Sequence, residues 1–532
     1  MTVFAETDNK VEEEEVEKGG ELLFCGGTNW DTLRQYTLRP THENLISPTR
    51  LRPLIGVNIR SVAAGCVSCH CVALDVEGRV YTWGRNKKGQ LGHGDMLRRD
   101  KPTVVSGLAE HKIIKASAGR AHTVVLTNEG KSFAFGWNKH GQCGTGSAKT
   151  EFEQSPVSSQ VSEVTNVVCG GDFTVWLSSV EGSSILTAGL PQYGQLGHGT
   201  DNEYNTKSSA VKLAYEAQPR PKAIAAFAEK TIVKVACGTN HTVAVDSEGF
   251  VYTWGCGGYG RLGHREQKDE WTPRVVDIFQ RRNVLPPNAL VAAGALNSAV
   301  TAGGGQLYMW GKLKTKGDDW MYPKPLLDLS GWDIRCMDSG ATHSFVGADE
   351  SCISWGHSEN GELGYGPIGP KSSANPKKVD SLEGMHVLSV ACGSAYSMVV
   401  VDRTNVGDKL NQLDVYDGKA SEEEPKAESP AQKKGGAKAS SNKRKKSKDL
   451  PESENEEDKS DDGGSKKGSD DENGHVEQKK RGGGRGRGNG AKKPAAGEGT
   501  GRGRGRPPSA EKKSTQPRSG GTGGKRGRPR KS

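Results

Sequence analysis

The chain has 532 residues, a formal net charge of +9 and 26% charged residues. No stretch approaches the ~18–20 consecutive apolar residues of a membrane helix, and the acidic start Val11-Glu-Glu-Glu-Glu-Val-Glu17 predicts no secretory signal. We therefore expect no membrane contact, and we expect the 11 cysteines to be reduced in cytosol or nucleus.

The positive charge is concentrated in the C-terminal quarter. Residues 404–532 carry 32 Lys+Arg against 21 Asp+Glu, a net of +11, whereas residues 1–403 carry 41 against 43, a net of −2. A basic tail on a near-neutral body predicts a polyanion partner, with nucleic acid ahead of acidic protein. Residues 1–19 are acidic, and we expect them to be disordered.

A strand followed by a glycine-rich turn recurs along residues 20–403. The stretch Val80–His93 returns almost unchanged at Val251–His264, and degraded copies occupy Phe133–Gly144 and Ile353–Gly364. A second signature, a small residue and a glycine before an apolar strand, occurs seven times. Its glycines are Gly65, Gly119, Gly170, Gly238, Gly294, Gly340 and Gly393. Self-similarity at this spacing indicates a repeat architecture.

The halves of the repeats do not balance, and the imbalance predicts how the fold closes. Seven first halves are followed by only six second halves, and an unmatched second half stands at Leu22–Trp30. A ring of sheets exposes open edges unless its last sheet is completed. We therefore predict an all-β, seven-bladed β-propeller of four-stranded blades over residues 20–403, with Leu22–Trp30 lying against Ala395–Val401.

Histidines recur at two repeat positions: His122, His241 and His343 in the strands, and His93, His198 and His264 in the turns. They could be metal ligands, but each stands on a different blade, so a structural role is favoured. Trp83, Trp254, Trp310 and Trp355 are interpreted as core between blades. Cys66-Val-Ser-Cys69-His70-Cys71 matches a haem-attachment string or half a zinc site, yet lacks a second cysteine pair. We predict no metal and no cofactor.

The residues Trp83–His93, Gly119–Thr123 and Gly238–Thr242 resemble the repeats of the regulator of chromosome condensation family. Within that family, Gly257–Glu270 and Ala348–Gly356 resemble the second, telophase-disc branch. The resemblance implies a nuclear or chromosome-associated protein that contacts small GTPases. Here the basic segment follows the propeller and does not precede it, so the founder's nucleotide-exchange activity is not carried over.

The fifth blade departs most from the repeat. Trp310-Gly311 is followed by a mixed-charge loop without the Gly-Gln-Leu-Gly turn. Loops on a rigid scaffold often carry binding, so Lys312, Lys314, Lys316 and Trp320 are candidate partner-binding residues. The alternative is a drifted loop with no partner.

Beyond Asp402 the composition predicts a disordered tail over residues 404–532. Its first part holds a candidate two-part nuclear localisation signal: Lys433, Lys434, Lys443, Arg444, Lys445 and Lys446. An acidic block follows, in which Ser460 and Ser469 are candidate kinase sites.

The last 54 residues, 479–532, carry 18 Lys+Arg and two acidic residues. They contain two Arg-Gly-Arg-Pro motifs, Arg504-Gly505-Arg506-Pro507 and Lys525-Arg526-Gly527-Arg528-Pro529-Arg530, which resemble AT-hooks. Glycine between arginines leaves a thin ribbon that suits a narrow, negative minor groove. The alternative is an Arg-Gly RNA-binding tail, supported by Arg481–Arg487.

No catalytic motif appears in the sequence. The sequence predicts a monomeric, chromatin-associated scaffold that binds a small GTPase or chromosomal partner and is tethered to DNA by its tail. Two alternatives stay open: an active guanine-nucleotide exchange factor, and a nucleolar RNA-binding protein.

Overall fold

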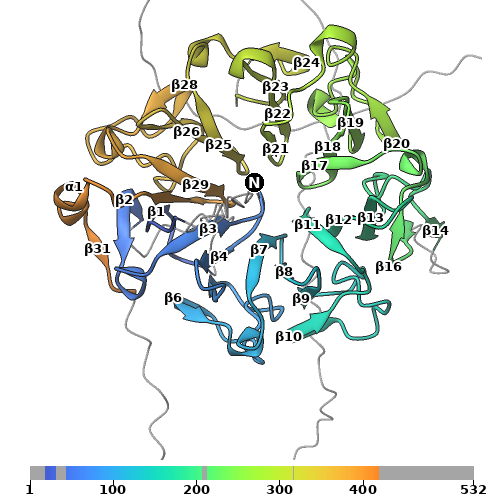
Figure 1. Ribbon diagram of the computed structural model, residues 1–532, viewed down its shortest axis with the longest axis horizontal. Helices are drawn as coiled ribbons and strands as arrows, with labels where there is room; N and C mark the ends of the chain where they lie inside the picture. The colour runs from blue at the N-terminus through green and yellow to red at the C-terminus, as the bar shows by residue number, and fades with distance from the viewer. Residues whose placement is uncertain (1–17, 31–43, 206–212, 315–316, 419–532) are drawn as a thin grey trace, which may run out of the picture. The chain divides into compact units, whose positions relative to one another are not determined.

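The computed structural model describes residues 18–30, 44–205, 213–314 and 317–418. In this part the chain forms seven mainly antiparallel sheets arranged as blades around a central axis (Figure 1). The innermost strand of each blade faces the centre of the ring: β3, β7, β11, β17, β21, β25 and β29. The predicted seven-bladed β-propeller is confirmed.

The first three blades follow the chain from the inner to the outer strand. Blade one contains β3 (Ile59–Ala63), β4 (His70–Asp75), β5 (Val80–Gly84) and β6 (Arg99–Val104). Blade two contains β7 (Ile113–Ala118), β8 (His122–Thr127), β9 (Ser132–Trp137) and β10 (Phe152–Ser158). Blade three contains β11 (Val164–Cys169), β12 (Phe173–Ser178), β13 (Ile185–Gly189) and β16 (Gln218–Ala223).

The next three blades have the same strand order. Blade four contains β17 (Ile232–Cys237), β18 (His241–Asp246), β19 (Val251–Gly255) and β20 (Glu270–Val275). Blade five contains β21 (Val291–Ala293), β22 (Asn297–Thr301), β23 (Leu307–Gly311) and β24 (Trp320–Pro325). Blade six contains β25 (Ile334–Ser339), β26 (His343–Ala348), β27 (Ser351–Gly356) and β28 (Ser373–Lys378).

Blade seven joins the two ends of the ring. Its strand order is β29 (Val387–Cys392), β30 (Tyr396–Val401), β1 (Glu21–Gly26), β2 (Leu45–Leu51) and β31 (Val415–Tyr416). Six consecutive residue pairs connect β1 to β30, from Glu21 with Val401 to Gly26 with Tyr396. In Figure 1 the blue N-terminal strands therefore meet the orange C-terminal strands in one sheet. The predicted contact between Leu22–Trp30 and Ala395–Val401 is confirmed.

The propeller continues past residue 403, where the sequence placed its end. A short helix α1 (Gly407–Asn411) follows β30, and β31 adds a fifth, parallel strand to β2. Val406 and Leu410 are buried in the core cluster between blades six and seven. The prediction that disorder begins at residue 404 is thus wrong for residues 404–418, because these few apolar side chains cover a core edge.

The blades are held together by apolar side chains from neighbouring sheets. The second strands are buried along their whole length, as in β8, because a blade is covered by a neighbour on each face. Trp83, Trp254, Trp310 and Trp355 each pack against the preceding blade, which confirms their predicted core role. The glycine after each tryptophan has a positive φ, for example 110° at Gly84, where a Cβ would lie 2.7 Å from the His70 Cα.

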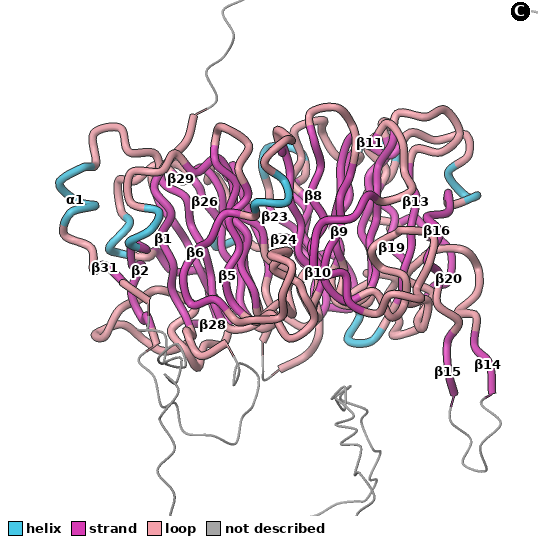
Figure 2. The backbone as a smooth tube through the Cα atoms, turned by 90° about the horizontal axis from the view of Figure 1, so that it is seen from below, coloured by secondary structure: helices cyan, strands magenta, loops and turns pink. Residues whose placement is uncertain are grey.

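Several smaller elements complete the described structure. A hairpin of β14 (Glu203–Asn205) and β15 (Leu213–Tyr215), inserted in blade three, projects from one face of the ring (Figure 2). Single 3₁₀ turns connect blades or close loops: η1 (Arg52–Leu54), η2 (Ser106–Leu108), η3 (Ala225–Phe227), η4 (Gly258–Gly260), η5 (Arg281–Asn283), η6 (Gly303–Gly305), η7 (Leu327–Leu329) and η8 (Asp380–Leu382). None of the helices in the described ranges is long and apolar enough to cross a membrane.

Candidate functional site

A recurring hydrogen-bond chain crosses the joints between blades. His122 Nε2 of blade two lies 2.9 Å from Thr174 Oγ1 of blade three, and this hydroxyl donates to the Gln142 carbonyl oxygen at 2.7 Å. Because the hydroxyl has one hydrogen, Thr174 accepts the bond from the imidazole N–H. The neutral histidine therefore connects its own blade to the next one.

The same joint recurs around the ring. His70 contacts Thr123 Oγ1 at 2.9 Å, His241 contacts Ser298 Oγ at 2.9 Å, and His343 contacts Ser397 Oγ at 2.8 Å. Burial lowers the pKa of His70 and of His241 to about 3 and that of His122 to about 4. These imidazoles act as neutral structural bridges, as the sequence favoured.

The turn histidines have a structural partner as well. His93, His198 and His264 each place Nε2 2.9 Å from a threonine hydroxyl of the third strand in their own blade. Within the described ranges, no three His, Cys, Asp or Glu side chains are grouped to hold a metal ion. Cys69 and Cys71 are buried in the apolar core between blades seven and one.

The joint between blades five and six departs from this pattern in two ways. Asn297 occupies the histidine position of blade five, and no hydrogen bond in the described structure joins its shorter side chain to Ser344 of blade six. The turn that would offer a carbonyl to Ser344 is missing after Gly311. Ser344 Oγ instead contacts Ser339 Oγ of its own blade at 2.9 Å. Blade three also lacks the histidine, but there the buried ring of Phe173 fills the position.

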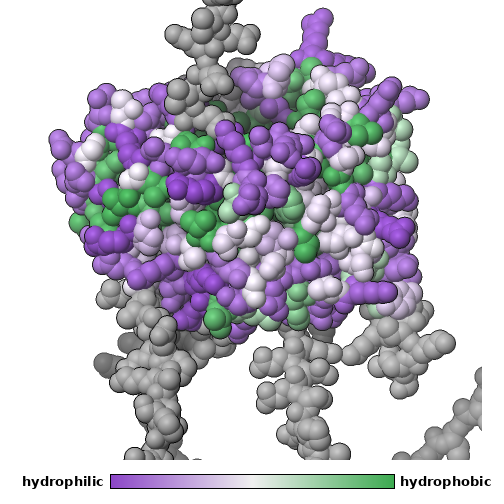
Figure 3. Space-filling model, turned by 60° about the horizontal axis from the view of Figure 1, so that its bottom comes forward, coloured by the Kyte–Doolittle hydropathy of each residue, from purple (hydrophilic) through white to green (hydrophobic). Residues whose placement is uncertain are grey.

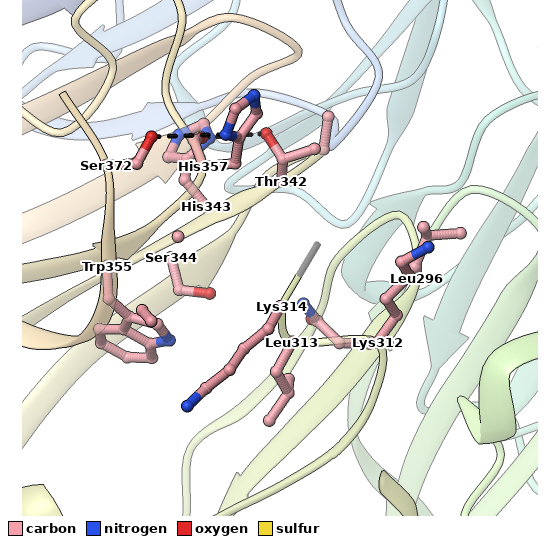
Figure 4. Close-up of a pocket in the computed structure, with 14 residues that line it drawn as sticks. Leu296, Lys312, Leu313, Lys314, Thr342, His343, Ser344, Trp355, His357 and Ser372 are labelled. Atoms are coloured by element: carbon pink, nitrogen blue, oxygen red, sulfur yellow. Dashed lines mark hydrogen bonds between the residues drawn. The ribbon is translucent and has the colours of Figure 1, made fainter. Parts of the chain in front are cut away.

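A pocket of ≈ 170 Å³ opens at this irregular joint. Leu296, Leu313 and Trp355 form apolar walls, and Ser344 is a polar group in the pocket. In Figure 4 Trp355 lies on one side and Lys312, Leu313 and Lys314 lie on the other. The pocket thus lies where a regular blade would place its turn.

Two of the predicted partner-binding lysines line this pocket. Lys312 Nζ lies 4.6 Å from the centre of the Tyr259 ring, and Lys314 Nζ makes one long contact of 3.4 Å with Asn375 Oδ1. Neither forms an ion pair with another described residue. Trp320 is only half-buried beneath the Lys324 ammonium, which lies 5.3 Å from its ring. Lys316 lies outside the described residues.

The sequence revealed the missing turn but not the pocket. The signal that could have found it is the coincidence of two losses in one repeat: Gly294-Ala-Leu-Asn297 lacks the histidine, and the same blade lacks Gly-Gln-Leu-Gly. In blade three, where the turn is present and only the histidine is lost, the buried ring of Phe173 fills the position.

The predicted tail sites fall on residues 419–532, outside the described structure. They are the localisation signal from Lys433 to Lys446, the serines Ser460 and Ser469, and the motifs at 504–507 and 525–530. Most of the acidic segment 1–19 also lies outside it.

Comparison with known protein families identifies the family of the propeller. The Regulator of chromosome condensation (RCC1) repeat matches residues 77–126, 129–177, 184–245, 248–300 and 349–400, about half of the chain. The chain belongs to the regulator of chromosome condensation family. The matched stretches leave out residues 301–348, which contain the irregular blade-five loop.

Within the family, the relatives confirm the predicted second branch. Protein RCC2 of Homo sapiens is 38% identical over 421 residues, covering 75% of this chain and 79% of the human protein. Its Xenopus laevis homologue is 39% identical over 423 residues, covering 75% and 81%. Prp20p of Saccharomyces cerevisiae, 21% identical over 74% of this chain and 94% of that structure, superposes with a TM-score of 0.57 and shows the shared fold.

Proposed function

We propose that the chain is a nuclear, chromatin-associated propeller that binds a small GTPase through the blade-five loop and is held on DNA by its basic tail. The carrying observation is the pair Lys312 and Lys314, two cations without an acidic partner in the described structure, at the joint where blade five lacks both the bridging histidine and the Gly-Gln-Leu-Gly turn. The family supports the partner class, since the yeast Prp20p structure is reported together with its binding to Gsp1p and histones.

Replacing Lys312, Lys314 and Lys316 by alanine should weaken binding to the GTPase about tenfold or more. The reason is that cations at a contact rim attract the acidic surface of a partner and speed association. Binding is measured by surface plasmon resonance against a panel of small GTPases at two salt concentrations. The triple variant Lys87→Ala, Lys101→Ala and Lys112→Ala, on another part of the ring, should bind as the unaltered chain does; unchanged binding by the loop variant removes the proposal.

Replacing Arg526 and Arg528 by alanine should weaken binding to an A·T-rich duplex about tenfold. About 22 residues separate the two motifs, a flexible reach of ~25 Å, so both can engage one duplex with added avidity. For five or six contacted phosphates, the log–log salt slope of the full chain should be about −5. Fluorescence anisotropy measures both quantities, with Lys479→Ala/Lys480→Ala as the matched control. Equal binding to single-stranded RNA at the same salt would favour the RNA-binding alternative.

The second candidate is an active exchange factor, and the β14–β15 hairpin favours it. An exchange factor displaces nucleotide by wedging an element into the GTPase, and this hairpin projects from the ring (Figure 2). Its Tyr204 side chain is exposed. A nucleotide-release assay over the same panel, with residues 203–215 replaced by a Gly-Ser linker, separates the two candidates. Accelerated release that the linker abolishes supports the exchange factor; binding without release supports the scaffold.

A further inference from the structure

We propose that the pocket between blades five and six binds a turn from a partner protein, of the type Gly-Glu-Leu-Gly or Gly-Gln-Leu-Gly with acidic residues nearby. The partner would supply in trans the turn that blade five lacks. This inference shares one assumption with the proposed function, namely that the blade-five loop contacts a partner protein.

The regular blades show how such a turn is bound. In blades one, three and four its second glycine lies against an aromatic ring of the next blade. A Cβ added at Gly92 would lie 2.8 Å from the Phe135 ring, and at Gly197 or Gly263 it would lie 3.0 Å from Trp254 or Trp310. The second glycine of the turn is therefore required, because any larger residue would clash with the aromatic side chain against which the turn packs.

The backbone of the turn is bound by two kinds of donor. Hydroxyls of the next blade donate to its carbonyls: Thr123 Oγ1 to Gln90 O at 2.9 Å, and Ser298 Oγ to Arg261 O at 2.8 Å. At the joint of blades three and four, Trp254 Nε1 donates to Gln195 O at 2.9 Å. The next blade thus recognises a glycine-containing turn through one ring and one or two donors.

Blade six offers the same groups to a vacant joint. Trp355 lines the pocket, and no residue in the described ranges accepts a hydrogen bond from its Nε1. Ser344 occupies the position of Thr123 and Ser298 in its strand, and among the described residues its hydroxyl is hydrogen-bonded to Ser339 alone. Leu296 and Leu313 provide apolar walls for a leucine side chain. The recognition surface is complete except for the turn itself.

The charge of the rim selects the acidic form of the turn. Lys312 and Lys314 line the opening without ion pairs in the described structure, so a glutamate or a neighbouring carboxylate would be attracted. The chain contains an acidic turn of this type in blade six, Gly361-Glu362-Leu363-Gly364, where the buried Glu362 carboxylate accepts hydrogen bonds from Ser358 and Asn360 of its own turn. A peptide with the sequence Ser358–Gly366 is therefore a probe of defined chemistry.

The test measures binding of that fluorescein-labelled nine-residue peptide to the full-length chain by fluorescence anisotropy. Ala374 is an exposed residue of the pocket wall, so Ala374→Trp should block the pocket and weaken binding tenfold or more. Lys312→Glu/Lys314→Glu should weaken it similarly, whereas the control Lys371→Glu, an exposed change outside the pocket lining, should not. A peptide carrying Leu363→Lys and Gly364→Val should also fail to bind.

Two outcomes would overturn the proposal: no saturable binding of the probe, or binding that Ala374→Trp leaves unchanged. Thermal melting checks that each variant is folded, which is expected because the changed side chains are exposed or partly exposed. Since the probe contains no GTPase, failure of the peptide and failure of the GTPase contact are separate results. A peptide that binds while no GTPase does would keep the pocket and remove the proposed function.

Discussion

Replacing Glu21 by alanine should lower the free energy of unfolding by about 3 kcal/mol, because two partly buried arginines lose their shared counter-charge. Glu21 is only 2% exposed. Its Oε1 accepts a bond from Arg50 Nε at 3.0 Å, and its Oε2 accepts one from Arg403 Nε at 2.8 Å. Arg50 belongs to the N-terminal β2 and Arg403 follows β30, so one carboxylate ties together the two ends of the ring.

Equilibrium urea unfolding measures this effect, with Glu77→Ala as the matched control. Glu77 pairs with Arg79 at 3.0 Å, but its side chain is 56% exposed, and exposed pairs contribute about 0–1 kcal/mol. Hydrogen exchange should also become faster in β1 and β30 of the Glu21 variant. A loss below about 1 kcal/mol, or exchange that accelerates equally in all blades, would show that the closing blade does not depend on this carboxylate.

Closure of the ring could be predicted because it follows from counting halves of a repeat. The unmatched strand Leu22–Trp30 required a partner with an open edge, and only the last repeat had one. The outer strands could not be found in the same way. β2 contains Pro48, Thr49 and Arg50 and lacks the alternation of a half-buried strand, and β31 has only two residues.

The end of the propeller was misplaced because composition averages over many residues. Residues 404–418 are mostly polar, but Val406 and Leu410 are four apart and face the same core cluster once a helical turn forms. These two buried side chains and the pairing of β31 with β2 order a segment whose overall composition resembles the tail.

In the sequence, the candidate site could be located only from the missing turn of blade five. The absent turn and the lysines of blade five can be read from the sequence, whereas the pocket depends also on the length of the Asn297 side chain. An imidazole at Asn297 would reach across the joint, as His122 reaches Thr174. The shorter amide does not, and the absent turn and absent bridge together leave space.

Acid should destabilise the propeller because its bridging histidines are buried in the neutral form. Burial gives His70 and His241 folded-state pKa values of about 3 and His122 about 4, against about 6.5 in an unfolded chain. Between pH 4.5 and 6 the unfolded state therefore binds one more proton per histidine. Their stabilising contribution is complete above pH 6.5 and is lost as the pH falls toward 4.

One buried carboxyl acts in the opposite direction. Burial raises the pKa of Asp338 to about 7, so this group takes up its proton in the folded state first and favours folding at lower pH. The three bridging histidines against this aspartate leave two protons in excess, about 3 kcal/mol per pH unit at 1.36 kcal/mol per proton. The turn histidines His93, His198 and His264, whose pKa values burial lowers to about 4, make the slope steeper. Burial also lowers the pKa of His343, which adds to the loss in acid.

Urea unfolding at half-unit steps from pH 7.5 to 4.5 tests this sign and slope. His122→Gln should flatten the slope by about 1.4 kcal/mol per pH unit, because one proton uptake is removed. Thr174→Val removes the same inter-blade bond without removing a titrating group, so it should lower stability at every pH by about 1–2 kcal/mol and keep the slope. Equal slopes in the two variants would mean that proton uptake by the bridges does not cause the acid sensitivity. A slope that falls only in His122→Gln assigns it to the imidazole that joins blades two and three.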